Sequence, residues 1–190
     1  MFTLEIRNEI ALRVQQGYLL ANTLINESKP FVGWISKDAF PYIRKWCIEY
    51  VFWKESNKDL ISSRNSPNKI KNCNHLELII DNKILTINHL QKYEILPRKA
   101  KFRHNLTLEY NLFNDLDNIT INKMNYFQII HSGYNKVEKI FIVCLNEHNQ
   151  EIKKVEIEVE HHEEANSITI ADEIAFPLKK EVEEHLAGSQ

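Results

Sequence analysis

Apolar residues recur every three or four positions over the first part of the chain, which predicts an amphipathic helix from Thr3 to about Asn26. Thr3 is a suitable N-cap, and Glu5 lies in the first turn, where the helix dipole favours a negative charge. Gly17 lowers the intrinsic stability of the helix by about 1 kcal/mol relative to alanine. The predicted apolar face consists of Ile6, Ile10, Val14, Tyr18, Ala21 and Ile25.

A second helical pattern spans about 38–55. Pro41 falls in its first turn, where a missing N–H group is tolerated. The apolar face is broad and predicts burial on more than one side of the helix. It consists of Ala39, Ile43, Trp46, Tyr50 and Trp53, widened by Cys47 and Val51.

The pattern changes after a polar stretch at 56–74, which we interpret as a long loop. From residue 75 onward apolar residues alternate with polar ones, as in half-buried strands. A turn at Asp81-Asn82 joins the first two strands into a hairpin. The predicted strands are 75–80, 83–90, 106–113, 126–132, 137–147 and 152–160. The fold class expected is therefore α+β, with two N-terminal helices packed on a mainly antiparallel β-sheet.

Residues 1–160 are predicted to form a single domain, and 161–190 an acidic C-terminal arm. The arm contains one short apolar island, which includes Phe176 and Leu178. Leu178, Val182 and Leu186 are spaced at four and would share one face of a short helix. Two turns of helix are not stable alone, so we expect this segment to need a surface of this protein or of a partner.

Charge is divided unequally along the chain. Residues 1–150 hold 20 Lys and Arg against 15 Asp and Glu, a net +5, whereas residues 151–190 hold 4 against 11, a net −7. A basic body joined to an acidic end indicates a docking partner or a contact between the two parts.

Composition favours a cytoplasmic protein. No run of 18 apolar residues is present, so we expect no membrane partner, and the N-terminus lacks the apolar core of a signal peptide. The three cysteines, Cys47, Cys73 and Cys144, are widely spaced and form no CxxC pair, which is typical of a reducing compartment.

The most basic local segment is 98–104, and its candidate binding residues for a partner or nucleic acid are Arg98, Lys99, Lys101, Phe102 and Arg103. Cationic groups neutralise phosphates, and an aromatic ring can stack on a base. Three interpretations stay open: a solvated segment packed on the core, a site for an acidic protein or the chain's own arm, and a nucleic-acid site. The sequence pI of about 6.5 is low for a dedicated nucleic-acid binder.

Catalytic motifs are weak. Glu77, Asp81 and Lys83 are the residue types of a metal-dependent nuclease, but acid-x-Lys sequences are common in a chain this rich in charge. His75 and His89 are expected to face each other across the hairpin as a polar pair. We assign no catalytic residue, no metal ligand and no cofactor.

The leading hypothesis is therefore a non-catalytic protein-interaction factor. An adaptor, an antitoxin or an accessory protein of a bacterial or phage defence module would have this profile, docking a partner through the arm and the basic segment. The alternatives are an RNA- or DNA-binding module using 98–104 and, third, a metal-dependent nuclease.

Overall fold

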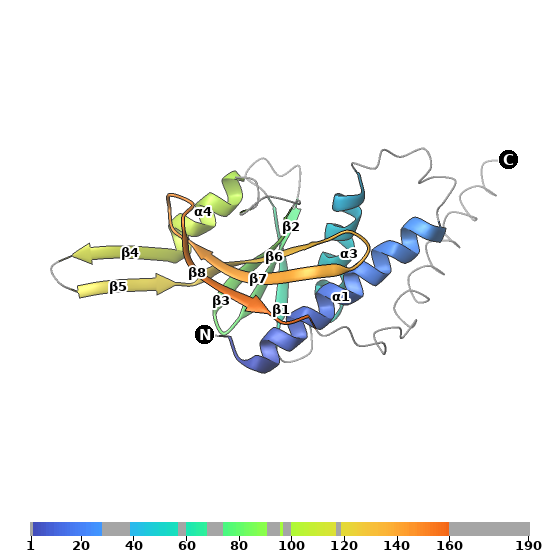
Figure 1. Ribbon diagram of the computed structural model, residues 1–190. Helices are drawn as coiled ribbons and strands as arrows, with labels where there is room; N and C mark the ends of the chain where they lie inside the picture. Colours follow the sequence, from blue (N-terminus) through green and yellow to red (C-terminus); the bar gives the residue numbers. More distant parts are fainter. Residues whose placement is uncertain are drawn as a thin grey trace.

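The computed structural model describes residues 2–27, 39–56, 60–67, 74–90, 96, 100–116 and 119–159 (Figure 1). The arm predicted for 161–190 lies outside these residues. The elements in chain order are α1 (Leu4–Glu27), α3 (Phe40–Lys54), β1 (Ser62–Pro67), β2 (Asn74–Ile80), β3 (Lys83–His89), α4 (Lys101–Tyr110), β4 (Asn111–Leu116), β5 (Ile119–Met124), β6 (Tyr126–Gly133), β7 (Val137–Leu145) and β8 (Glu151–Ile157).

Six strands form one sheet in the order β1-β2-β3-β6-β7-β8. All neighbours are antiparallel except β3 and β6, which run parallel. The chain between β3 and β6 contains α4 and the separate hairpin β4–β5, which extends away from the body of the molecule (Figure 1). The predicted α+β class with a mainly antiparallel sheet is confirmed. The long connection between β3 and β6 permits their one parallel pairing.

α1 and α3 cover one face of the sheet. The main core lies between these two helices and the sheet. Its buried residues include Ile10 and Val14 of α1, Ile48 and Phe52 of α3, and strand residues such as Leu85. Burial of this apolar surface is the main force that holds the helices on the sheet.

The opposite face of the sheet is covered by α4. Phe102, Leu106 and Tyr110, spaced at four, pack against Ile84 and Tyr126 of the sheet. The strand predicted for 106–113 is therefore wrong over 106–110. Apolar residues in this segment fit both the two-residue period of a strand and the spacing of one helix face. Packing on the sheet decides in favour of the helix.

Several local expectations are confirmed. The Ile6 amide donates to Thr3 Oγ1 at 3.3 Å, so Thr3 caps α1. Pro41 lies in the first turn of α3. Asp81 and Asn82 form the β2–β3 turn with φ of 49° and 60°, a backbone region that Asn and Asp tolerate better than most residues.

Two expectations need correction. The polar stretch 56–74 contains an edge strand, β1, which pairs with the hydrophobic strand β2. The face of α3 that faces inward is made by Arg44, Cys47, Ile48, Val51 and Phe52, so Trp46 and Trp53 are exposed. A helix that is apolar on most sides does not reveal from sequence which side the sheet will cover.

None of the helices in the described part of the chain is both long enough and apolar enough to cross a membrane.

Candidate binding surfaces

A row of polar side chains crosses four adjacent strands on the α4 face of the sheet. The strand registers pair Arg64 with Glu77, Glu77 with Thr86, and Thr86 with Gln128. Glu77, Thr86 and Gln128 are all buried, whereas Arg64 is exposed at the edge strand. Buried polar groups need hydrogen-bond partners, so this row must be satisfied within the protein or by a ligand.

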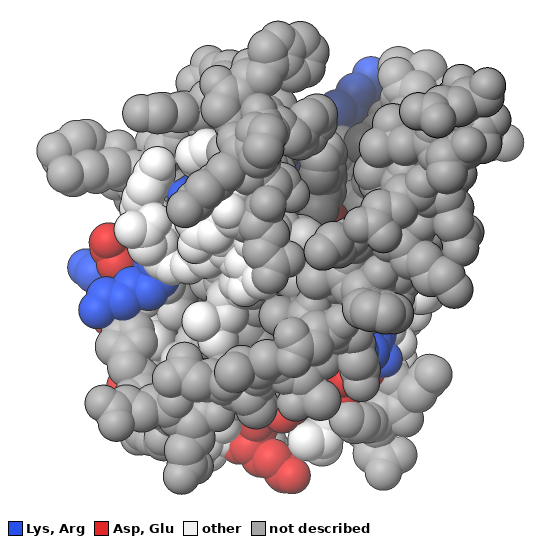
Figure 2. Space-filling view, turned by 90° about the vertical axis from the view of Figure 1, so that its right-hand side faces the viewer, with Lys and Arg blue, Asp and Glu red and all other residues white. Residues whose placement is uncertain are grey.

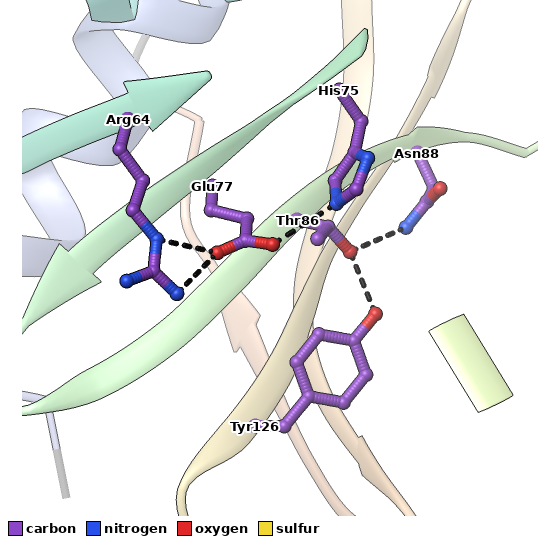
Figure 3. A network of polar contacts seen from close by, with 6 residues as sticks. All are labelled: Arg64, His75, Glu77, Thr86, Asn88 and Tyr126. Carbon is purple, nitrogen blue, oxygen red and sulfur yellow. Dashed lines mark hydrogen bonds and ion pairs between the residues drawn. The ribbon is translucent and has the colours of Figure 1, made fainter. Parts of the chain in front are cut away.

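Glu77 is held by groups on both sides (Figure 3). Arg64 donates to Glu77 Oε2 from Nε at 2.8 Å and from Nη2 at 2.7 Å, and His75 Nε2 lies 3.0 Å from Oε1. Burial would raise the pKa of Glu77, but hydrogen bonds from His75, Arg64 and Ser66 and the charge of Arg64 lower that pKa to about 2. Glu77 is therefore an ionised structural carboxylate with its oxygens occupied.

The remainder of the network joins β3, β6 and α4. The hydroxyls of Thr86 and Tyr126 lie 2.8 Å apart, and Asn88 donates from Nδ2 to Gln128 Oε1 at 3.1 Å (Figure 3 shows Thr86, Tyr126 and Asn88). Arg103 Nη1 donates to Asn88 Oδ1 at 2.7 Å, and burial lowers the pKa of Arg103. Arg103 thus anchors α4 to the polar row.

A cavity of about 480 Å³ lies where this row meets the N-terminal half of α4 and the turn between β7 and β8. Gln128, the last polar residue of the row, forms part of its wall. The lining residues are Ala100, Lys101, Arg103, His104, Thr107, Gln128 and Asn146 to Asn149. The wall combines cationic and amide groups, a composition suited to an anionic, hydrogen-bonding ligand.

The outward face of α3 carries exposed aromatic side chains. Tyr42, Trp46 and Trp53 are 60%, 61% and 53% exposed, and the Tyr42 and Trp46 rings lie 6.4 Å apart. Figure 2 looks at the end of the molecule where α1 terminates, and shows uncharged side chains gathered between charged groups at the edges. An exposed row of large aromatics on one helix is unusual for a surface that only contacts water.

A second groove, of about 940 Å³, runs between α1 and β8. Its charged groups are mainly acidic, and exposed Leu4 and Leu12 supply apolar surface. Its charged residues are Glu5, Arg7, Glu9, Glu156 and Glu158. The groove therefore differs in charge from the cavity beside α4.

A histidine is buried at the other end of the sheet. His131 is fully buried, with Nδ1 2.9 Å from the Tyr18 hydroxyl and its ring 5.2 Å from that of His89. Burial, with the nearby His89 and Arg44, lowers the pKa of His131 to about 3. His131 Nε2 has no hydrogen-bond partner among the described residues. The imidazole is therefore neutral and fixes α1 against β6.

Of the candidate binding residues, Lys101, Phe102 and Arg103 lie in the first turn of α4, and only Lys101 is exposed. Phe102 stacks on His75, with ring centroids 4.3 Å apart, and Arg103 is bonded to Asn88. The structure therefore separates one solvent-facing cation from two residues that pack inward. The other candidates, Arg98, Lys99, Phe176, Leu178, Val182 and Leu186, lie outside the described residues.

The three nuclease candidates do not form one site: Lys83 Nζ donates to the backbone carbonyl of Asp81 at 3.4 Å, but Glu77 lies apart from both. Glu77 lies on the α4 face of the sheet, whereas Lys83 lies over the Phe2 ring on the opposite face. Over the described ranges no group of three or more His, Cys, Asp or Glu is close enough to hold a metal ion. The expected pairing of His75 with His89 is also wrong, because His75 contacts Glu77 and His89 contacts His131 on the other face.

Sequence reasoning missed the cavity beside α4, because its wall comes from three segments far apart in the chain. Comparisons with protein-family models, with curated proteins and with solved structures gave no match for this chain. The fold and these surfaces define an α+β protein with an exposed aromatic helix face and a separate polar cavity.

Proposed function

We propose that this chain is a non-catalytic protein-interaction factor of the cytoplasm that binds a partner protein on the outward face of α3. The observation that carries the proposal is the exposure of Tyr42, Trp46 and Trp53 on one side of that helix. Trp and Tyr are enriched among the residues that dominate binding energy at protein interfaces. An adaptor, antitoxin or defence accessory protein would act in this way.

Among the described residues, the core does not require the outward face of α3 to be apolar. The inward side of α3 already supplies Cys47, Ile48, Val51 and Phe52 to the core, so Trp46 and Trp53 are not needed there. Exposed indole rings carry a cost in solubility that a polar side chain would avoid. Retaining two of them on one helix supports a role in binding.

Charge indicates the kind of partner. Residues 1–150 carry a net +5, and the cations that adjoin the two tryptophans in sequence are Lys54 and Lys45, of which Lys45 pairs with Glu49 at 3.0 Å. A partner with apolar side chains set among acidic residues would complement this surface. The predicted C-terminal arm is proposed as a second contact, made through Phe176 and Leu178.

The test places a photo-crosslinking amino acid at position 46, identifies the cross-linked polypeptide by mass spectrometry, and then measures its affinity in purified form. Trp46→Ala should weaken binding at least tenfold, because truncating a central aromatic commonly costs about 2 kcal/mol or more. Leu108→Ala is the matched control, since Leu108 is equally exposed but lies on α4.

Binding that Trp46→Ala leaves unchanged would contradict the proposal. Cross-links that join only two copies of this chain, or only α3 to residues 161–190 of the same chain, would also contradict a separate partner.

A further inference from the structure

We propose that the cavity between α4 and the β7–β8 turn binds the phosphate monoester group of a small molecule. This site is separate from the aromatic face of α3 and does not depend on the protein-interaction function. Three features of the cavity support this: the charge of its wall, a largely buried glutamine that lines it, and its size.

The wall of the cavity carries more cationic than anionic groups. Lys101 and Arg103 are positively charged, and His104 and His148 add imidazoles, whereas Glu147 is the single acid of the described wall. Lys101 is exposed and forms no ion pair with a described residue. Ammonium and guanidinium groups form strong charge-assisted hydrogen bonds with phosphate oxygens.

The start of α4 adds donors to this wall. Ala100 occupies the N-cap position without a side-chain hydrogen bond, and the first turn contains no acidic residue. The first backbone N–H groups of a helix have no partner within the helix, so an anion placed here would accept hydrogen bonds from them.

Gln128 is an independent sign of a ligand. Gln128 is only 3% exposed, yet it lines the cavity. Its amide oxygen accepts from Asn88, while its amide nitrogen donates to none of the described residues. Because Gln128 lines the cavity, its amide group can form hydrogen bonds with a polar ligand bound there.

Size and composition favour a small molecule over a nucleic-acid strand. A volume of about 480 Å³ is within the usual range for small-molecule sites, roughly 300–1,000 Å³. Strand-binding sites rely on aromatic rings that stack on bases. The nearest aromatic in sequence, Phe102, packs against His75 and is not free to stack.

The experiment titrates the full-length protein with ribose 5-phosphate by calorimetry, with ribose, inorganic phosphate and a dT12 oligonucleotide as comparators. Ribose 5-phosphate should bind saturably and ribose should not. Lys101→Gln should weaken binding about tenfold, the loss expected for one charge-assisted hydrogen bond. Amide NMR shifts should change at 101–104 and 146–149.

The matched control is Lys139→Gln, which removes an exposed lysine near the opposite end of β7 and should change affinity less than twofold. The proposal fails if ribose 5-phosphate does not bind, if Lys101→Gln binds it as well as the wild type does, or if ribose binds equally. Binding of dT12 alone would assign the surface to nucleic acid and overturn a small-molecule site.

Discussion

The side chain of Asn111 satisfies four backbone groups at the point where α4 ends. Its Oδ1 accepts from the amides of Asn125 and Tyr126 at 3.0 and 2.8 Å, and its Nδ2 donates to the carbonyls of Tyr126 and Leu145 at 3.1 and 3.2 Å. One buried amide group therefore joins the end of α4 to β6 and β7.

We expect Asn111→Ala to lower the free energy of unfolding by about 2–4 kcal/mol, because it leaves several buried groups without partners. Urea denaturation followed by circular dichroism measures this change. Asn105→Ala is the matched control: Asn105 is exposed on α4, so its loss should change stability by less than about 0.5 kcal/mol. Equal effects of the two substitutions would mean that the Asn111 contacts contribute little.

His131 makes the stability of the fold depend on pH. Its pKa is about 3 in the folded protein and about 6.5 when exposed, so between these values the unfolded chain binds more protons than the folded one. Stability should therefore fall as the pH drops below about 6.5, by at most about 1.4 kcal/mol per pH unit from this group. Replacing His131 with Asn should flatten the slope between pH 6.5 and 5.

His148→Asn is the control for that measurement, because it removes a histidine whose side chain is 73% exposed. Glu77, with a folded pKa near 2, adds acid sensitivity only as the pH falls below about 4.5, outside the window used. A slope that His131→Asn leaves intact would show that the imidazole is charged in the folded state.

The amino-acid types of the basic segment predicted only in part which of its side chains are exposed. Lys101 is exposed as a run of cations predicts, but Phe102 and Arg103 turn inward to His75 and Asn88. Their partners are on β2 and β3, and no local pattern in the sequence indicates that pairing. A cationic residue is recognised from sequence, but whether it is neutralised by a distant amide is a property of the fold.

The crossing of α1 and α3 depends on Gly17. A methyl group there would lie 2.6 Å from the Ile48 Cα atom, so the two helix backbones would have to move apart. We expect Gly17→Ala to destabilise the protein by about 1–3 kcal/mol, although alanine is intrinsically the better helix former by about 1 kcal/mol. Thermal and urea unfolding measure the difference.

Asn8→Ala, on the exposed side of α1, provides the comparison for helix propensity alone and should be neutral or slightly stabilising. If Gly17→Ala were stabilising by a similar amount, the close approach of the helices would not contribute to the free energy of unfolding.

Element prediction succeeded where one period and one packing partner dominate. α1, α3 and the strands β2, β3, β6 and β7 follow their patterns within a few residues. It failed at α4, where Phe102, Leu106 and Tyr110 share a helix face but Leu106, Leu108 and Tyr110 also alternate. The choice depends on the surface offered by Ile84 and Tyr126, which sequence periodicity does not contain. The parallel pairing of β3 with β6 likewise depends on tertiary contacts.

At the scale of the whole molecule, the separate binding surfaces have different chemistry. The outward face of α3 is aromatic, the cavity beside α4 is cationic, and the groove between α1 and β8 is mainly acidic. Surfaces of unlike charge on one protein can engage unlike ligands at the same time. This separation allows the two proposals to be tested independently, because substitutions on α3 leave the cavity untouched.

The acidic C-terminal arm, proposed as a second contact, allows a further prediction about binding of the partner protein. The segment 161–190 is net acidic, and Phe176 and Leu178 are its strongest apolar anchors. If the arm contributes to binding, the double substitution of Phe176 and Leu178 to Ser in the full chain should weaken affinity about tenfold for the partner identified through position 46. Calorimetry with the purified partner measures this change.

The control replaces His161 and His162 with Ser, which alters the same segment without removing an apolar anchor. Equal affinity for all three proteins would restrict the interface to the folded body and leave α3 as its proposed centre.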